Sequence, residues 1–327
     1  MNSIFSLIIL FAALLFMLFI VVKSSGYVVK YGIRLAKNFN ISEAILGVVI
    51  ISVATSLPEF GLAVNAMISG GELINVSIGD IFGANIADLT LVLGIAAIAT
   101  PIIIRKKLFQ DLSGILFLTA LFPILIIAIP HSRFVGFLLL AAYIIFTVNM
   151  FRRRKEIEHP AEIVTDMPNK QFKTNFYNIL GFVLAIATLL VAAHFALLSA
   201  SSIAEHLGLA KSFIGATIVA FGTTLPELSV SVQAAIKRKF DIALGNAIGS
   251  AIANLGLILG LILIIRPVIV NVPIFSVLST ALIAAVIFVW YFISDGKLAR
   301  REGGILLAGY ALFMIIMTIT ALIAGKV

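Results

Sequence analysis

Four acidic residues occupy stretches of the chain that are otherwise apolar. Glu59, Asp88 and Glu227 lie inside such stretches, and Asp80 lies near the start of one. A charged group at the centre of a bilayer costs about 2.5–3.5 kcal/mol on insertion scales, so it normally faces a polar interior or an ion. The same stretches contain no lysine or arginine that would pair with these acids. Unpaired carboxylates at similar depth therefore imply protons or bound cations.

A proline immediately precedes each of the two glutamates, as Pro58 and Pro226. Proline lacks an N–H and displaces the carbonyl four residues back, which here belongs to Ala54 or Gly222. Such backbone oxygens are tolerated inside a membrane only where they line a cavity or bind something. The two prolines therefore predict an interruption in each helix. Hydroxyl groups flank both interruptions, as Thr55, Ser56, Thr223 and Thr224.

Two further segments carry polar side chains at helical spacing. Asp80, Ala84 and Asp88 recur at i, i+4 and i+8, so they share one face of a helix. The matching stripe in the second half of the chain consists of Asn246, Ser250 and Asn254. Glycines beside both stripes, including Gly249, are expected to permit close helix contact.

Carboxylates, hydroxyls and freed carbonyls together make a cage of oxygen ligands. Calcium takes about 6–8 oxygens with flexible geometry, whereas magnesium rarely uses an all-protein cage. Sodium also suits these ligands, and soft metals would require Cys, Met or His, which are absent from these motifs. The residues predict a hard divalent cation exchanged for monovalent ions, with no cofactor.

The elements that must position these residues are transmembrane helices. The chain has 327 residues, of which 61% are hydrophobic and 12% charged, whereas soluble chains contain about 25% charged residues. A crossing needs roughly 20 apolar residues. The sequence predicts an all-α, multi-pass membrane protein with ten crossings, at 4–22, 44–68, 76–100, 112–130, 134–151, 175–201, 213–236, 241–265, 272–294 and 303–325. The mildly amphipathic residues 26–43 are expected to extend the second helix.

Basic residues define the orientation of these crossings. With an external N-terminus, 19 of the 23 lysines and arginines fall in cytoplasmic segments, as the positive-inside rule requires. The remaining four are Arg133, Lys211, Arg266 and Lys326. Both termini are therefore predicted outside the cell, with the 152–174 loop in the cytoplasm and the protein in the plasma membrane. The net charge of +8 thus reflects topology, and no nucleic-acid partner is expected.

The chain also contains an internal repeat. Residues 46–59, LGVVIISVATSLPE, correspond to 214–227, IGATIVAFGTTLPE, and residues 79–94, GDIFGANIADLTLVLG, correspond to 245–260, GNAIGSAIANLGLILG. Five predicted crossings separate equivalent positions, so the copies run in opposite directions. Inverted repeats are characteristic of secondary transporters, whose sites lie near the midplane. We predict a first five-helix repeat at 1–151, a cytoplasmic linker at 152–174 and a second repeat at 175–327.

These paired motifs resemble the cation/calcium exchanger superfamily, in its prokaryotic sodium/calcium exchanger branch. The resemblance is carried by ATSLPEF at 54–60 and GTTLPEL at 222–228, each followed by G-[DN]-x-x-G-[AS]-x-I-A-[DN]. It implies ten helices in two inverted repeats and exchange of Ca²⁺ for Na⁺ by alternating access. The ligands that it implies are Glu59 and Glu227, surrounded by Thr55, Ser56, Thr223, Thr224, Ser250, Asp88 and Asn254, with the main-chain carbonyls of Ser52 and Ala220.

The sequence departs from this family's pattern at several positions. Ala84 stands where a hydroxyl ligand is typical, and Asp88 and Asn254 are exchanged relative to a common arrangement. Asp80 replaces the usual asparagine. Secondary or entrance positions are expected at Asp80, Ala84 and Asn246. Sodium is the expected coupling ion, and a proton/Ca²⁺ antiporter on the same scaffold is the alternative.

Other functional classes fit the sequence less well. A cation channel could use the same acids, but an inverted repeat within one chain favours alternating access. An intramembrane hydrolase would need a Ser–His or Ser–Lys pattern, which does not occur, so no enzymatic activity is expected. The expected partners are the lipid bilayer and inorganic cations, with no obligate protein partner.

Overall fold

The computed structural model describes residues 2–121, 133–152, 168–206, 220–266 and 272–324. The first half contains α1 (Asn2–Asn38), α2 (Glu43–Ile45), the π-helical η1 (Leu46–Ile51), α3 (Ser52–Thr55), α4 (Leu57–Ser69), α5 (Glu72–Ala87), the π-helical η2 (Asp88–Val92), α6 (Leu93–Ala99), β1 (Ile102–Ile103), α7 (Lys106–Leu121) and α9 (Arg133–Arg152). The second half contains α11 (Pro168–His206), α13 (Ala220–Thr223), α14 (Leu225–Ile236), α15 (Phe240–Ala253), the π-helical η4 (Asn254–Leu259), α16 (Gly260–Ile265), α17 (Val272–Ser294), β2 (Lys297–Leu298) and α18 (Arg300–Ala324).

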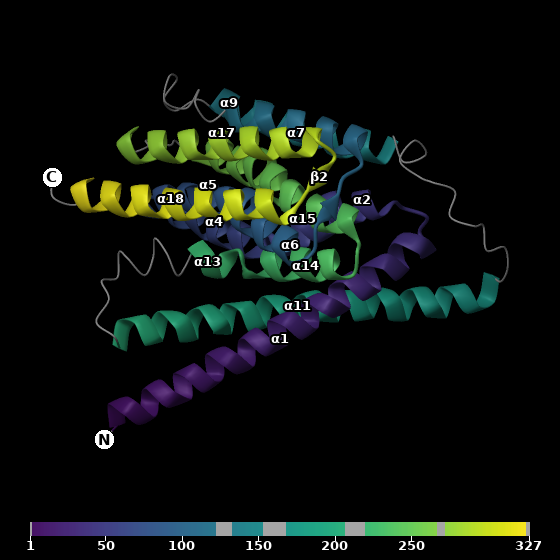
Figure 1. Cartoon of the computed structure of the whole chain (residues 1–327), viewed down its shortest axis with the longest axis horizontal. Helices are drawn as coiled ribbons and strands as arrows, with labels where there is room; N and C mark the ends of the chain where they lie inside the picture. Colours follow the sequence, from purple (N-terminus) through teal and green to yellow (C-terminus); the bar gives the residue numbers. More distant parts are fainter. Residues whose placement is uncertain (1, 122–132, 153–167, 207–219, 267–271, 325–327) are drawn as a thin grey trace.

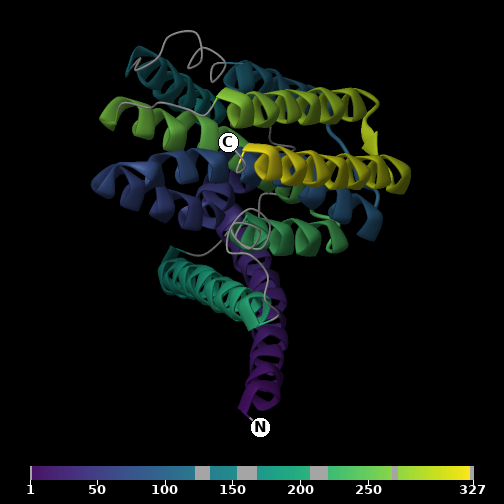
Figure 2. The same ribbon diagram turned by 90° about the vertical axis from the view of Figure 1, so that its left-hand side faces the viewer.

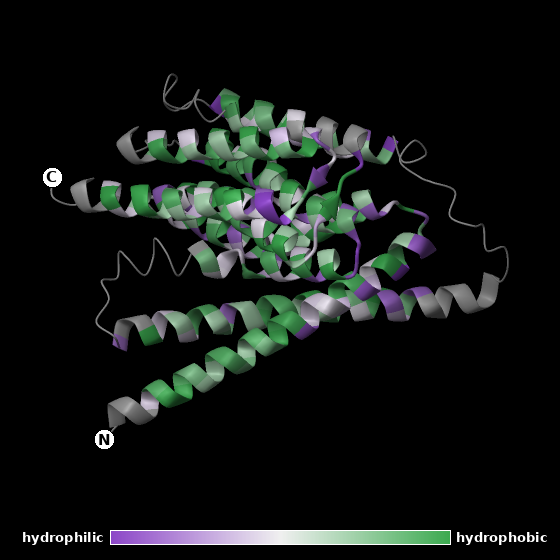
Figure 3. Cartoon of the chain, in the orientation of Figure 1, coloured by the Kyte–Doolittle hydropathy of each residue, from purple (hydrophilic) through white to green (hydrophobic). Residues whose placement is uncertain are grey.

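Long apolar helices dominate the described residues. Seven of them are long and apolar enough to cross a membrane, and an eighth span is the bent pair Glu43–Thr55 and Leu57–Ser69. The two other predicted spans, 112–130 and 213–236, lie partly outside the described residues, and their described parts are the helices α7 and α13–α14. Apolar residues cover the outer helices over most of their length (Figure 3).

The helices form layers around a central group (Figures 1 and 2). α5 and α15, each continued by a π-helical segment, lie in the interior with α4 and α14. α7, α9 and α17 cover one side, whereas α1 and α11 pack on each other at the opposite side. The buried apolar residues form one continuous core that includes members of both halves.

One sequence prediction about these elements needs correction. Residues 26–38 continue α1 and do not extend the second helix, because the hydroxyls of Ser24 and Ser25 bond to carbonyls of the preceding turn and the helix is not interrupted. The predicted all-α fold class is confirmed, and the described residues add a two-residue antiparallel ladder in which Ile102 pairs with Leu298. The predicted linker 152–174 lies largely outside the described residues.

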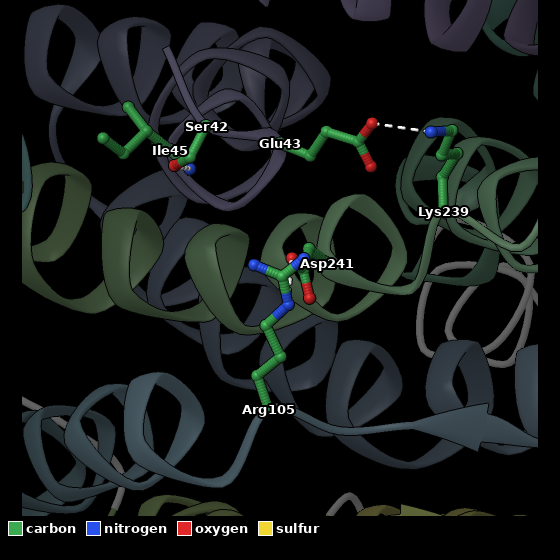
Figure 4. A network of polar contacts seen from close by, with 6 residues as sticks. All are labelled: Ser42, Glu43, Ile45, Arg105, Lys239 and Asp241. Carbon is green, nitrogen blue, oxygen red and sulfur yellow. Dashed lines mark hydrogen bonds and ion pairs between the residues drawn. The ribbon is translucent and has the colours of Figure 1, made fainter. Parts of the chain in front are cut away.

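Two ion pairs join the two halves of the described chain (Figure 4). Lys239, in the turn before α15, lies 2.7 Å from the Glu43 carboxylate at the start of α2. Arg105, just before α7, lies 3.3 Å from the carboxylate of Asp241. Both pairs join a segment of the first half to the start of α15.

Candidate cation-binding site

Both glutamate motifs lie at interruptions between two helices. α3 ends at Thr55, and α4 begins at Leu57 with a bend of 48°. In the second copy, α13 ends at Thr223 and α14 begins at Leu225. The prolines therefore occupy the first turn of a new helix, where a missing N–H is tolerated. Each glutamate belongs to the same first turn.

The two interruptions face each other across the repeats. Glu59 and Glu227 are each 1% exposed, and they lie close enough to interact electrostatically. The hydroxyl of Ser56 donates to Oε1 of Glu227 at 3.4 Å. A hydroxyl from one copy therefore contacts the acid of the other, and the predicted residues of both copies converge on one place.

The buried stripes of α5 and α15 meet these interruptions. Thr55 donates to Oδ1 of Asn246 at 3.1 Å, and Thr223 donates to Oδ1 of Asp80 at 3.3 Å. These two contacts are equivalent in the repeat. Ser250 lies 3.4 Å from the main-chain oxygen of Ser52, so one predicted carbonyl ligand also belongs to this group.

The remaining predicted residues are placed as follows. Ala84, Asp88 and Asn254 are each 1% exposed, and Thr224 is buried at the start of α14. Ala84 presents a methyl group where the family resemblance implies a hydroxyl. The backbone of Ala220 begins α13.

A close approach of backbones makes this convergence possible. A Cβ atom on Gly249 would lie 2.8 Å from Cα of Val48 and 2.9 Å from Cβ of Ser52. Only a residue without a side chain allows α15 to pack this closely against η1 and α3. The expected close contact at this glycine is confirmed.

Both stripes end at the start of a π-helical segment, η2 at Asp88 and η4 at Asn254. A π-helical turn carries an additional residue and occurs frequently at functional sites. Because these two residues are equivalent in the repeat, the irregularity is part of the repeated unit. No signal used in the sequence analysis predicted it.

Two polar residues were missed by the sequence analysis. Asn85 accepts a hydrogen bond of 3.0 Å from Nδ2 of Asn254. Ser231 accepts one of 3.0 Å from Nδ2 of Asn246, whose amide also donates to the main-chain oxygen of Glu227 at 3.2 Å. Both are buried, and the signal available in the sequence was a polar residue within an otherwise apolar segment.

Acceptor oxygens without donors distinguish the site chemically. Buried oxygens with no hydrogen-bond partner are found on Glu59, Asp80, Asp88, Glu227 and Asn254. The ion pairs among the described residues involve other carboxylates. Buried polar atoms in proteins are nearly always paired, so this concentration of lone pairs fits a cation. Within the described chain, no three His, Cys, Asp or Glu side chains form a metal cluster.

Comparison with known families gives a match to each half of the chain. The sequence profile of the family described as sodium/calcium exchanger protein matches residues 9–152 and again residues 177–319. The chain belongs to the sodium/calcium exchanger family. The resemblance that the motifs indicated is therefore confirmed.

Individual exchangers and membrane proteins are similar over most of the chain. The sodium/calcium exchanger MaX1 of Methanosarcina acetivorans is 29% identical, over 94% of this chain and 98% of its own. The membrane protein MJ0091 of Methanocaldococcus jannaschii is 29% identical, over 85% of this chain and 87% of its own.

Solved exchanger structures confirm the fold. A structure of the sodium-calcium exchanger NCX_Mj, soaked with 10 mM Na⁺ and zero Ca²⁺, superposes with a TM-score of 0.80 at 29% identity, covering 94% of this chain and 98% of that one. Another, soaked with 10 mM Na⁺ and 10 mM Sr²⁺, also gives 0.80. The predicted multi-pass architecture of inverted repeats is that of this exchanger family.

Proposed function

We propose that the protein exchanges Ca²⁺ for Na⁺ across the membrane by alternating access. The observation that carries this proposal is the group of buried, donor-free oxygens where the two interrupted helices meet. Calcium accepts mixed carboxylate, carbonyl and hydroxyl ligands. The family, together with the relatives named for sodium/calcium exchange, supports the choice of ions.

The ligand roles follow from the geometry of the interruptions. Glu59 and Glu227 supply the principal charge, and Asp88 adds a third carboxylate that interacts electrostatically with Glu227. Thr55, Ser56, Thr223, Thr224 and Ser250 supply hydroxyl oxygens, and Ser52 and Ala220 supply main-chain oxygens. The sodium ions that are exchanged compete with calcium for the same oxygens, so calcium and the exchanged sodium ions cross in separate half-cycles.

The empty site disfavours transit without cargo. Uncompensated carboxylates inside a bilayer are costly, so the unloaded protein is hindered from switching between its two sides. This penalty couples the movement of one ion to the movement of the other.

The peripheral pair α1 and α11 is positioned to change access to the site. These helices pack on each other outside the group that carries the ligands (Figure 2). Ser229 of α14 is joined to Ser25 of α1 by a hydrogen bond of 2.7 Å. This bond must break when α1 slides along α14.

We further propose a plasma-membrane location with both termini outside and the 152–174 loop in the cytoplasm. The distribution of basic residues supports this orientation. Arg105 and Lys239, which form the two ion pairs shown in Figure 4, belong to the segments assigned to the cytoplasm. The repeats 1–151 and 175–327 would each supply one interrupted helix to the site.

Transport by calcium-loaded vesicles tests this function. We expect an inward sodium gradient to drive calcium efflux, and Glu59→Gln and Glu227→Gln to abolish it, whereas Asp295→Asn, at an exposed carboxylate, retains it. Efflux driven by a pH gradient without sodium would instead establish the proton/Ca²⁺ alternative, which the missing hydroxyl at Ala84 favours. Intact calcium exchange in either glutamine variant would contradict the assigned site.

A further inference from the structure

Asp80 and Asn246 are equivalent residues, but their hydrogen bonding differs. Both accept a hydrogen bond on Oδ1 from the threonine at the interruption of the opposite copy. The Nδ2 group of Asn246 donates to Ser231 and to the main-chain oxygen of Glu227. Oδ2 of Asp80 is buried and has no hydrogen-bond partner.

The sequence of the first copy explains this difference. The glutamate motifs are offset by 168 residues, so Ala63 is the equivalent of Ser231 and the main-chain oxygen of Glu59 is the equivalent of that of Glu227. An asparagine amide can donate to such a carbonyl, but an ionised carboxylate accepts only. The first copy therefore presents acceptor oxygens where the second has an amide donor and a hydroxyl.

Charge strengthens the argument. Asp80 is a fourth buried acid beside Glu59, Asp88 and Glu227, and the carboxylates of Glu59 and Asp80 interact electrostatically. A single Ca²⁺ in the proposed site would leave two negative charges inside the membrane if all four acids were ionised. One further positive charge near Asp80 would reduce this residual negative charge. The ion pairs among the described residues place no basic side chain beside Asp80.

We propose that Asp80 holds an additional monovalent cation of the sodium class, which remains bound while calcium occupies the central site. Oδ2 of Asp80 is its principal ligand, with the Thr223 hydroxyl and the main-chain oxygen of Glu59 as the neighbouring oxygens. The inference rests on the proposed exchange function and deepens it, because it gives the loaded site two cations of different kinds.

Equilibrium binding of radioactive sodium to the purified full-length protein tests this inference. With the central site saturated by calcium, we expect wild type to retain one sodium ion per chain. Asp80→Asn should retain none. The double variant Asp80→Asn/Ala63→Ser reproduces the Asn246–Ser231 pair in the first copy and should also bind no sodium. It should keep the elution profile of wild type even if Asp80→Asn alone folds poorly.

The outcomes separate this inference from the proposed function. Wild type that exchanges calcium but binds no sodium under calcium saturation would overturn the Asp80 site and leave the exchange function standing. Asp80 variants that still retain the sodium ion under calcium saturation would also overturn the Asp80 site and leave the exchange function standing. If wild type does not transport calcium, the function fails, and the sodium difference between wild type and the variants in calcium-free buffer still decides the Asp80 site.

Discussion

The side-chain amide of Asn85 donates a hydrogen bond of 3.4 Å to the main-chain oxygen of Ala251, the residue at the equivalent position of the second repeat. A residue that contacts its own equivalent lies at the axis relating the two copies. Asn85 also receives the amide of Asn254 at 3.0 Å. It is therefore a positioning residue that links the axis to a proposed ligand.

Replacing Asn85 by alanine should reduce calcium exchange. The change leaves the Asn254 amide without its acceptor in a buried place, which costs about 1–3 kcal/mol, and Asn254 becomes free to turn. We expect a higher KM for calcium together with a lower midpoint of thermal unfolding. Asn65→Ala, at an exposed asparagine of α4, serves as the control. Equal effects of the two substitutions would contradict the role of Asn85.

Asn246→Ala should be more damaging than Ser231→Ala. The first removes the acceptor of Thr55 and two donated hydrogen bonds. The second removes one acceptor, a loss of about 1 kcal/mol for a typical hydrogen bond. Thermal unfolding in detergent and the rate of sodium-driven calcium efflux should both rank wild type above Ser231→Ala, and Ser231→Ala above Asn246→Ala. The reverse order of the two variants would refute the network.

Gly249→Ala should destabilise the protein and impair transport. The added methyl group would overlap Val48 and Ser52, and overpacking of this kind costs about 1–3 kcal/mol. Gly304→Ala is the matched control, since no described atom lies within 4 Å of a Cβ at that position. Unfolding midpoints measured for both variants check the contact, and a neutral Gly249→Ala would show that the two segments can separate without penalty.

The two ion pairs of Figure 4 should differ in their effect on stability. Glu43 and Lys239 are both about one-third exposed, and such pairs contribute about 0–1 kcal/mol. Arg105 instead faces Asp241, whose side chain is 10% exposed, so Arg105→Ala leaves an enclosed carboxylate unpaired. We expect a larger loss of thermal stability for Arg105→Ala than for Lys239→Ala. Equal losses would mean that Asp241 finds another partner.

The predicted orientation can be measured directly because the chain contains no cysteine. Single substitutions Ser3→Cys and Thr165→Cys introduce one thiol each, near the N-terminus and in the predicted cytoplasmic loop. A membrane-impermeant maleimide added to intact cells should label the first and label the second only after permeabilisation. The opposite pattern would invert the topology.

The sequence predicted the interrupted helices and the convergence of their residues, because the same prolines, hydroxyls and acids occur in both copies of the repeat. Pro58 and Pro226 fix the interruptions, and the paired motifs require their hydroxyls and acids to meet. The stripes on α5 and α15 followed from helical periodicity alone.

Other features depend on contacts that periodicity does not encode. The π-helical start at Asp88 and Asn254 has no compositional mark, since the same residues would fit an α-helix. The first crossing was predicted to end at residue 22, whereas α1 continues to Asn38 and the hydroxyls of Ser24 and Ser25 bond within the helix. The role of Asn85 depends on the axis, whose position is known only after the copies are assembled.

The position of the buried acids breaks the symmetry between the two open states. In a perfectly symmetric inverted repeat, a two-fold rotation would relate the inward-open and outward-open states, and the two states would have equal free energy. Here the third carboxylate is Asp88 in one copy, opposite the neutral Asn254 in the other, and both are enclosed. The two states consequently differ in energy even without a gradient, and the protein is expected to rest preferentially open to one side.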